Sequence, residues 1–262
     1  MRRFSAGYLE RTRAGMWEDS VAALEGLELP TRRRILDVGC GTGELTAVLR
    51  AESPATVVAC DVDRALLEHV GGPCLLGDAL ALPVQTDGVD LVTCQALLIN
   101  LSDPVGALEE FARVSSDRVA VVEPDNGAVT VDSSVAAESA LEETARRAYL
   151  AGVETDVTLG ADAAPLLERA GLSVLETARY DHERVIEPPY DEDDVRDTRR
   201  KATGAGLAED EATMLAGGLT RTEYEALRSD WRAMGRAVAE AMAEGTYRRR
   251  EVVPFHVTVG QV

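Results

Sequence analysis

The sequence is poor in lysine, cysteine, histidine and aromatic residues. Of its 27 basic residues only Lys201 is a lysine, and aromatic side chains make up 4% of the 262 residues. So few aromatic rings give no evident cage for a quaternary amine and no stacking platform for nucleobases. The sequence also lacks any run of about 18 apolar residues, so we expect no membrane-spanning helix and no membrane partner.

The cysteines and histidines form no recognisable metal-binding pattern. No Cys-x-x-Cys pair is present, which argues against zinc, and a chain of this length needs no disulfide framework. We therefore predict no metal site and four small buried thiols: Cys40, Cys60, Cys74 and Cys94. His69 and His256 are predicted to be structural, whereas His182 is kept open as a general base. We assign no other catalytic residue.

The chain is strongly acidic, with 46 acidic residues against 27 basic ones and a net charge of −19. A nucleic-acid partner is not expected, because such a partner requires clustered cations. The acidic, lysine-poor composition resembles that of proteins from salt-loving microbes with a saline cytoplasm, although a GC-rich genome would also favour arginine. The basic N-terminal segment lacks the apolar stretch of a secretory signal, so a cytoplasmic location is expected.

Short apolar runs alternate with helical periodicities through the first half of the chain. Strands are predicted at 34–38, 56–60, 74–79, 89–94 and 118–124, and helices at 16–28, 43–52, 63–72 and from Asp103 onward. This alternation predicts a parallel sheet with right-handed crossovers. Because the strands are nearly continuous apolar runs, we expect helices on both faces, which is a doubly wound α/β fold.

The second half is more helical and more charged. Helices are predicted at 133–151, capped by Ser133 or Ser134, and at 162–170, and strands at 172–187 and 252–260. Between the two strands lies a charged segment whose longest predicted helix covers 221–244. Because this segment interrupts a strand pair, we predict a helical cap over 188–249. The sheet domain is predicted to comprise 1–187 plus 250–262.

The sharpest motif is ILDVGCGTGEL at residues 35–45, directly after a predicted strand and before a predicted helix. Gly39 and Gly41 permit a positive φ and a close approach of the backbone to a ligand. Gly43 permits the helix to start against the strand. Asp37, at the strand end, is expected to hold backbone donors or a ligand ammonium. The backbone N–H groups of the loop and of the helix start favour a carboxylate or a phosphate.

A nicotinamide-binding Rossmann loop uses the same kind of turn, with the spacing Gly-x-Gly-x-x-Gly. Glu44 stands where the third glycine of that pattern would fall. A glutamate beside a pyrophosphate would be repelled, so the motif favours a ligand without phosphate.

The motif resembles the first motif of class I S-adenosylmethionine-dependent methyltransferases, and the following features fall in the order of that family. The resemblance implies that Asp61 binds the two ribose hydroxyls, with Val62 beside it. It implies that Asp78 and the backbone of Ala79 bind the adenine. The remaining residues that it implies at the cofactor are Asp37, Gly39, Cys40, Gly41, Gly43 and Gln95.

The resemblance further implies a mostly parallel, seven-stranded Rossmann-like sheet, with residues 252–260 as an antiparallel last strand. S-adenosylmethionine would be the cofactor and a small molecule the acceptor, because EPDN at 123–126 fits the branch that includes quinone C-methyltransferases. Small-molecule members often carry Leu-His-His-Leu where this chain has LINL at 98–101, so the acceptor chemistry is not assigned.

Three alternatives stay open at this point: an RNA or protein methyltransferase, a non-catalytic protein of the same fold, and a nucleotide-binding oxidoreductase. The predicted cap and the helix at 133–151 are expected to line the acceptor pocket. A dimerisation surface is the other interpretation of the cap, and either a monomer or a homodimer is expected.

Overall fold

The computed structural model describes residues 6–13, 15–18 and 20–262, and the chain divides into two compact units. The first unit comprises Met1–Asp125, Thr158–Tyr180 and Pro254–Val262. The second unit comprises Asn126–Val157 and Asp181–Val253. The predicted cap at 188–249 lies wholly within the second unit, and its expected role at the acceptor pocket stays a prediction.

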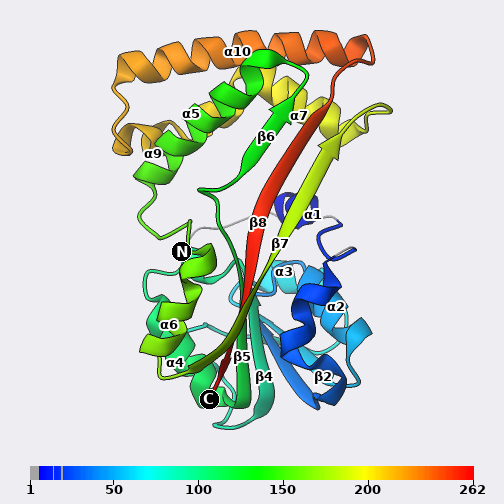
Figure 1. The fold of residues 1–262 in the computed structure, drawn as a ribbon, viewed down its shortest axis with the longest axis vertical. Helices are drawn as coiled ribbons and strands as arrows, with labels where there is room; N and C mark the ends of the chain where they lie inside the picture. The colour runs from blue at the N-terminus through cyan, green and yellow to red at the C-terminus, as the bar shows by residue number, and fades with distance from the viewer. Residues whose placement is uncertain (1–5, 14, 19) are drawn as a thin grey trace. The chain divides into compact units, whose positions relative to one another are not determined.

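An eight-stranded, mostly parallel sheet with flanking helices forms the framework, as the α/β prediction requires (Figure 1). Its path is β3-β2-β1-β4-β5-β8-β6, and β7 also pairs with β8. The strands are β1 Arg34–Val38, β2 Thr56–Asp61, β3 Cys74–Leu76, β4 Val89–Gln95, β5 Ser115–Pro124, β6 Thr130–Ser133, β7 Ser173–Ile186 and β8 Arg249–Gln261. Strand β8 runs antiparallel to β5, which confirms the orientation predicted for the last strand.

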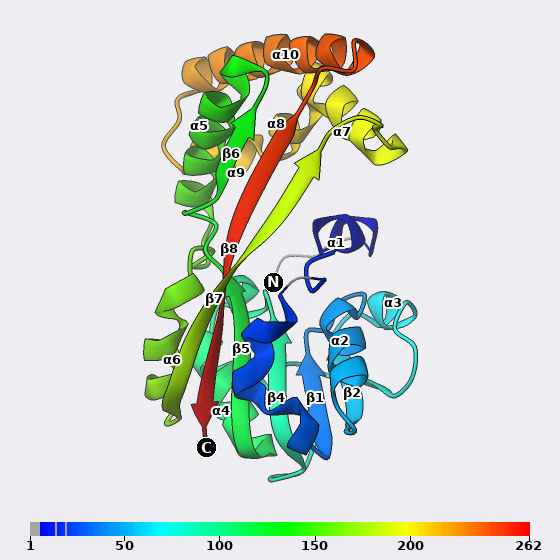
Figure 2. The same ribbon diagram turned by 45° about the vertical axis from the view of Figure 1, so that its right-hand side comes forward.

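The helices of the first unit cover both sides of its part of the sheet. They are α1 Ala6–Arg13, α2 Glu44–Glu52, α3 Arg64–Leu67, α4 Pro104–Val114 and α6 Ala163–Arg169. Helices α4 and α6 lie together on one side of the sheet and α2 on the other (Figure 2). Asp103 caps α4 as predicted, because its Oδ1 accepts a hydrogen bond from Gly106 N at 2.9 Å. The same helix fully buries Leu108, Phe111 and Val114.

Two helices predicted in the first unit are shorter in the structure than the sequence pattern indicated. The predicted helix at 16–28 is a 3-10 helix over Val21–Leu27, which ends where Glu28 adopts a φ of 51°. Residues 14 and 19 lie outside the described residues. Helix α3 stops at Leu67, and the chain continues in tighter i→i−3 turns as far as Val70 before two glycines.

The prediction of seven strands was wrong by one, because β6 takes residues that were assigned to a helix or a loop. Helix α5, Ala136–Gly152, therefore begins three residues later than predicted. Neither predicted cap is used, since Val135 is the N-cap and Ser133 lies in β6. A four-residue strand carries too short a pattern to be recognised, and pairing with β8 creates it.

The second unit packs its helices around a core of aromatic and apolar side chains. Its helices are α5, α7 Glu192–Thr203, α8 Ala205–Glu209, α9 Glu211–Ala216 and α10 Arg221–Ala243. Helix α10 confirms the predicted long helix. Of its five predicted core residues, Met242 is partly buried and the others are buried: Leu227, Trp231, Met234 and Val238.

Three of the four cysteines are buried, and Cys74 is exposed, so the prediction of a buried side chain was wrong there. Its strand β3 is a short strand at the end of the sheet path, which leaves the thiol at the surface. Across the described ranges, no cluster of three or more His, Cys, Asp or Glu side chains is arranged to hold a metal ion. No helix within those ranges is long and apolar enough to span a membrane.

Candidate cofactor site

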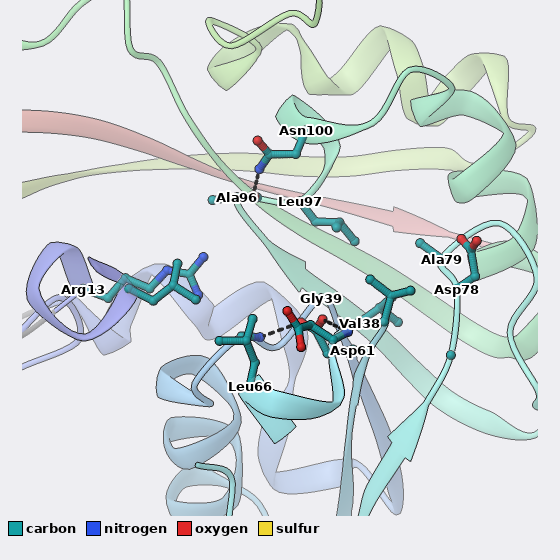
Figure 3. A pocket seen from close by; sticks show the side chains of 15 residues that line it. Arg13, Val38, Gly39, Asp61, Leu66, Asp78, Ala79, Ala96, Leu97 and Asn100 are labelled. Carbon is teal, nitrogen blue, oxygen red and sulfur yellow. Dashed lines mark hydrogen bonds between the residues drawn. The ribbon is translucent and has the colours of Figure 1, made fainter. Parts of the chain in front are cut away.

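A cavity of about 450 Å³ lies in the first unit at the carboxyl ends of β1, β2 and β4 (Figure 3). Its size falls within the range of small-molecule sites, and in open α/β sheets ligands bind at this edge. Six of the ten residues predicted to bind the cofactor line it: Gly39, Gly41, Asp61, Val62, Asp78 and Ala79.

The glycine loop forms one wall of the cavity. Gly39 and Gly41 have φ values of 67° and 58°, the left-handed conformation that the motif predicted. A Cβ atom on Gly41 would lie 3.0 Å from Cδ1 of Leu9 and 3.2 Å from Nη1 of Arg13. The missing side chain at Gly41 thus lets Leu9 and Arg13 pack closely against the loop, and a larger residue would crowd both.

Asp61 ends β2 and faces this loop. The residue is 6% exposed, and Oδ2 of its carboxylate accepts a hydrogen bond from Gly41 N at 2.9 Å. Its Oδ1 accepts one from Asp63 N at 2.8 Å. Each carboxylate oxygen can accept a second hydrogen bond, so the side chain can still bind a vicinal diol.

The opposite side of the cavity is formed by the segment after β3. Gly77, Asp78 and Ala79 line it, and a short bridge pairs Asp78 with Ala81. Oδ1 of Asp78 accepts a hydrogen bond from Leu80 N at 3.0 Å, which fixes the turn. Ala79 is buried and lines the same wall.

The loop after β4 supplies a third wall through Ala96, Leu97 and Asn100. Ala96 has a φ of 49°, which is uncommon for a residue with a side chain. Its N–H donates to the carbonyl of Val122 at 2.8 Å, and its own carbonyl accepts from Nδ2 of Asn100 at 2.7 Å. Local hydrogen bonds thus hold a strained turn beside the cavity.

Helix α1 contributes Leu9 and Arg13, which sequence analysis did not identify. The Arg13 side chain is 11% exposed, and its Nη1 lies 3.9 Å from Oε2 of Glu44. A single guanidinium in a short helix carries no spacing signal, so only the folded structure places this charge in the wall.

Four predicted residues lie outside the lining of the cavity: Asp37, Cys40, Gly43 and Gln95. Asp37 is fully buried and accepts from the hydroxyls of Thr46 and Thr93. Burial raises the pKa of Asp37 to about 6, although these two hydroxyls and the charge of Arg13 lower it. Asp37 therefore lies inside the sheet, behind the glycine loop, where its hydrogen bonds to Thr46 and Thr93 can stabilise the end of β1.

The other three have different surroundings. Gly43 is the N-cap of α2 with a φ of 93°. Cys40 is buried, and burial raises the pKa of its thiol. Gln95 ends β4, is 3% exposed and donates from Nε2 to Sδ of Met16 at 2.6 Å. Its Oε1 has no hydrogen-bond partner within the described part of the chain.

None of the three histidines is among the residues that line this cavity. His69 is half-exposed near Glu10, at 3.5 Å. His182 is buried on β7 in the part of the strand that belongs to the second unit, and His256 faces Glu123 in the strand register. The role of His182 as a general base stays a prediction.

Comparisons with known proteins agree with this geometry. Residues 36–121 match the methyltransferase domain family. The chain is 36% identical over 94 residues to demethylmenaquinone methyltransferase of Corynebacterium efficiens, covering 35% of this chain and 40% of that protein. It is 38% identical over 111 residues to malonyl-[acyl-carrier protein] O-methyltransferase of Halorhodospira halophila, covering 38% of this chain and 37% of that protein.

The chain thus spans about two fifths of the length of these curated relatives. Among solved structures, it is similar to a Bacillus halodurans protein provisionally described as a methyltransferase. The TM-score is 0.53 and the identity 16%, and the match covers 93% of this chain and 98% of that one, which shows a shared fold. The matched family, the glycine turn and the acids after β2 and β3 together identify residues 36–121 as a methyltransferase domain of the class I type, with S-adenosylmethionine as its cofactor.

Proposed function

We propose that this protein transfers a methyl group from S-adenosylmethionine to a small-molecule acceptor. The observation that carries the proposal is the cavity in which three strand ends meet: the glycine loop after β1, Asp61 after β2 and Asp78 after β3. Bound there, the cofactor would supply a methyl group already activated on a sulfonium.

Each wall of the cavity suits a different part of that cofactor. Asp61 would accept hydrogen bonds from the ribose diol, and Asp78 with Ala79 would bind the adenine edge. The largely covered guanidinium of Arg13 suits the methionine carboxylate, because charge-assisted hydrogen bonds to carboxylates are strong and directional. Gly39 lines the cavity with backbone alone, and Leu97 takes the space that a Cβ atom would need there.

The acceptor is expected near a group of buried polar atoms in the first unit. Oε1 of Gln95, Nε1 of Trp17 and the hydroxyl of Tyr180 have no hydrogen-bond partner among the described residues. The rings of Trp17 and Tyr180 are 5.1 Å apart, and Gln95 contacts Met16. Buried polar atoms without partners are costly, so this group favours a ligand with polar atoms of its own.

The names of the relatives support a small acceptor, because one acts on demethylmenaquinone and another on a malonyl group carried by a protein. The net charge of −19 argues in the same direction, since it opposes binding to nucleic acid. The protein's own task would be to align the acceptor atom with the methyl group and to exclude water. A cytoplasmic location and a halophilic source stay predictions.

Calorimetry tests the cofactor first. We expect S-adenosylmethionine and S-adenosylhomocysteine to bind with a Kd on the order of micromolar, a common range for such ligands, and NAD not to bind. Heat with NAD and none with S-adenosylmethionine would contradict the proposal.

The acceptor is tested with S-adenosylmethionine that carries a labelled methyl group, added with the enzyme to a cell extract. The proposal expects the label in a low-molecular-weight compound. Label found only in the RNA or protein fraction would contradict the small-molecule part and leave methyl transfer intact.

A further inference from the structure

A buried carboxylate lies against the loop after β4 in the first unit. Glu123, the second-last residue of β5, is fully buried. Its Oε1 accepts hydrogen bonds from the backbone N–H groups of Leu97 and Leu98, at 3.1 and 2.8 Å. Its Oε2 accepts one from Ile99 at 3.4 Å. Three consecutive amides of one loop thus converge on one side chain.

This loop forms part of the cavity wall, whereas Glu123 is not among the lining residues. A Cβ atom on Gly39 would lie 2.8 Å from Cδ1 of Leu97, so the Leu97 side chain packs directly against the glycine loop. Any change in the position of the Leu97 backbone would therefore move a side chain that borders both the glycine loop and the cavity.

Burying the carboxylate of Glu123 costs free energy, because the charged form loses its hydration. Burial raises the pKa of Glu123 to about 7, although the three loop amides and the charge of Arg13 lower it. The other titratable groups around it are Cys94, whose Sγ lies 3.9 Å from Oε1, and its register partner His256. Apolar residues often replace buried charged groups without loss of stability, so an acid here points to a role beyond packing.

We propose that Glu123 is a positioning residue for cofactor binding, because its side-chain oxygens hold the Ala96–Asn100 loop in the conformation that forms a wall of the cavity. The inference rests on the proposed function in taking this cavity as the S-adenosylmethionine site. Glu123 acts through the Leu97 and Leu98 amides and touches no ligand itself.

Two variants separate the hydrogen bonds from the volume of the side chain. Glu123→Met has a similar length but no oxygen, so the three amides lose their acceptor. Glu123→Gln keeps one carbonyl oxygen, which can still accept from Leu97 and Leu98. Asp90→Leu is the matched control, because Asp90 accepts from two consecutive amides, Arg33 N at 2.8 Å and Arg34 N at 3.0 Å, at the opposite end of β1.

The readouts are calorimetric affinity for S-adenosylhomocysteine and hydrogen exchange of the 97–99 amides, with melting temperature to confirm folding. We expect Glu123→Met to bind roughly tenfold more weakly, because hydrogen bonds that shape the wall are lost, and its 97–99 amides to exchange faster. Glu123→Gln should stay within about threefold of wild type, since its carbonyl oxygen can still accept from the Leu97 and Leu98 amides. Asp90→Leu should lower the melting temperature without changing affinity.

Two outcomes would overturn the inference. One is a Glu123→Met variant with wild-type affinity and protected 97–99 amides. The other is an equal loss of S-adenosylhomocysteine affinity in the Gln and Met variants. That result would exclude a role for the side-chain oxygen that glutamate and glutamine both have. If the wild-type protein fails to bind S-adenosylhomocysteine, the proposed function fails, and the amide exchange still decides whether Glu123 holds the loop.

Discussion

The backbone N–H of Gly41 donates to the carboxylate of Asp61 over 2.9 Å, which joins the glycine loop to the end of β2. This one contact ties together two segments that are 20 residues apart in the sequence. Because the other oxygen of Asp61 accepts from Asp63 N, the carboxylate is oriented before any ligand arrives. Such preorganisation lowers the cost of ordering the site on binding.

Asp61→Ala should weaken binding of S-adenosylhomocysteine by about 2–3 kcal/mol, because two hydrogen bonds from the ribose to a charged acceptor are lost. Calorimetry measures the change. Asp103→Ala is a suitable control, since Asp103 caps α4 and is not among the residues that line the cavity. An unchanged Kd for the Asp61 variant would mean that this acid is not the ribose ligand.

Gly39→Ala should weaken cofactor binding and lower stability by about 1–2 kcal/mol, because it combines a strained φ of 67° with a contact against Leu97. Gly171→Ala isolates the strain, since Gly171 has a φ of 86° and no atom within 4 Å of an added Cβ. Denaturant unfolding and calorimetry on both variants measure the two effects. Equal cofactor affinity in both would show that the Leu97 contact has no bearing on the site.

Stability should fall as the pH rises through neutrality, and Glu123 should carry part of the change. Its folded pKa, about 7, lies above its ordinary 4.5, so the folded state binds the proton more tightly than the unfolded state. The stabilising contribution is complete below pH 4.5 and is lost as the pH passes 7, by about 3 kcal/mol. Asp37, raised from 3.8 to about 6, acts in the same direction.

Comparing wild type with Glu123→Gln at several pH values isolates this contribution, because glutamine does not titrate. The variant should gain stability relative to wild type between pH 5 and pH 8, as measured by urea unfolding. A constant difference across that range would show that Glu123 does not titrate there.

The balance of 46 acidic against 27 basic residues predicts folding that depends on salt. Repulsion between like charges is poorly screened at 0.01 M salt, where the Debye length is about 30 Å, and well screened at 1 M, where it is about 3 Å. The melting temperature should therefore rise markedly between low and molar potassium chloride. A melting temperature that does not respond to potassium chloride would refute the halophilic interpretation.

The single lysine should stabilise the second unit through a buried ion pair. Lys201 donates to the carboxylates of Glu142, at 3.0 Å, and Glu138, which is fully buried. Burial alone would raise the pKa of Glu138, but the charge and hydrogen bond of Lys201 contribute to a lowered value. Lys201→Met should cost about 3 kcal/mol, because it leaves a buried carboxylate with one partner fewer.

The matched control for this variant is Arg196→Met, because Arg196 pairs with Asp193 at the surface, where both side chains are about half-exposed. Exposed pairs contribute about 0–1 kcal/mol, so this change should be nearly neutral. Urea unfolding of the full chain compares the two. A similar loss of unfolding free energy in both variants would show that burial does not strengthen the contribution of the Lys201 ion pair.

The sequence by itself determined the parallel sheet and the identity of the glycine loop that lines the cavity. Alternating strands and helices leave few topologies, and a glycine series directly after a strand indicates a tight turn with positive φ values, which other residues rarely adopt. These are local or periodic signals, so residues such as Gly39, Gly41 and Asp61 could be found without coordinates. Helix α10 was also found in this way, because 23 residues give a clear apolar stripe.

Only the tertiary structure decided which other side chains meet at that loop. Arg13 and Asn100 lie in the cavity wall although 87 positions separate them, and neither residue stands in a recognisable motif. Strand β6 exists because β8 offers it a pairing edge. Glu123 reads in the sequence as an acid at the end of a strand, and its three amide contacts depend on how β4 and β5 align. Contacts between distant segments arise from packing, which no local pattern encodes.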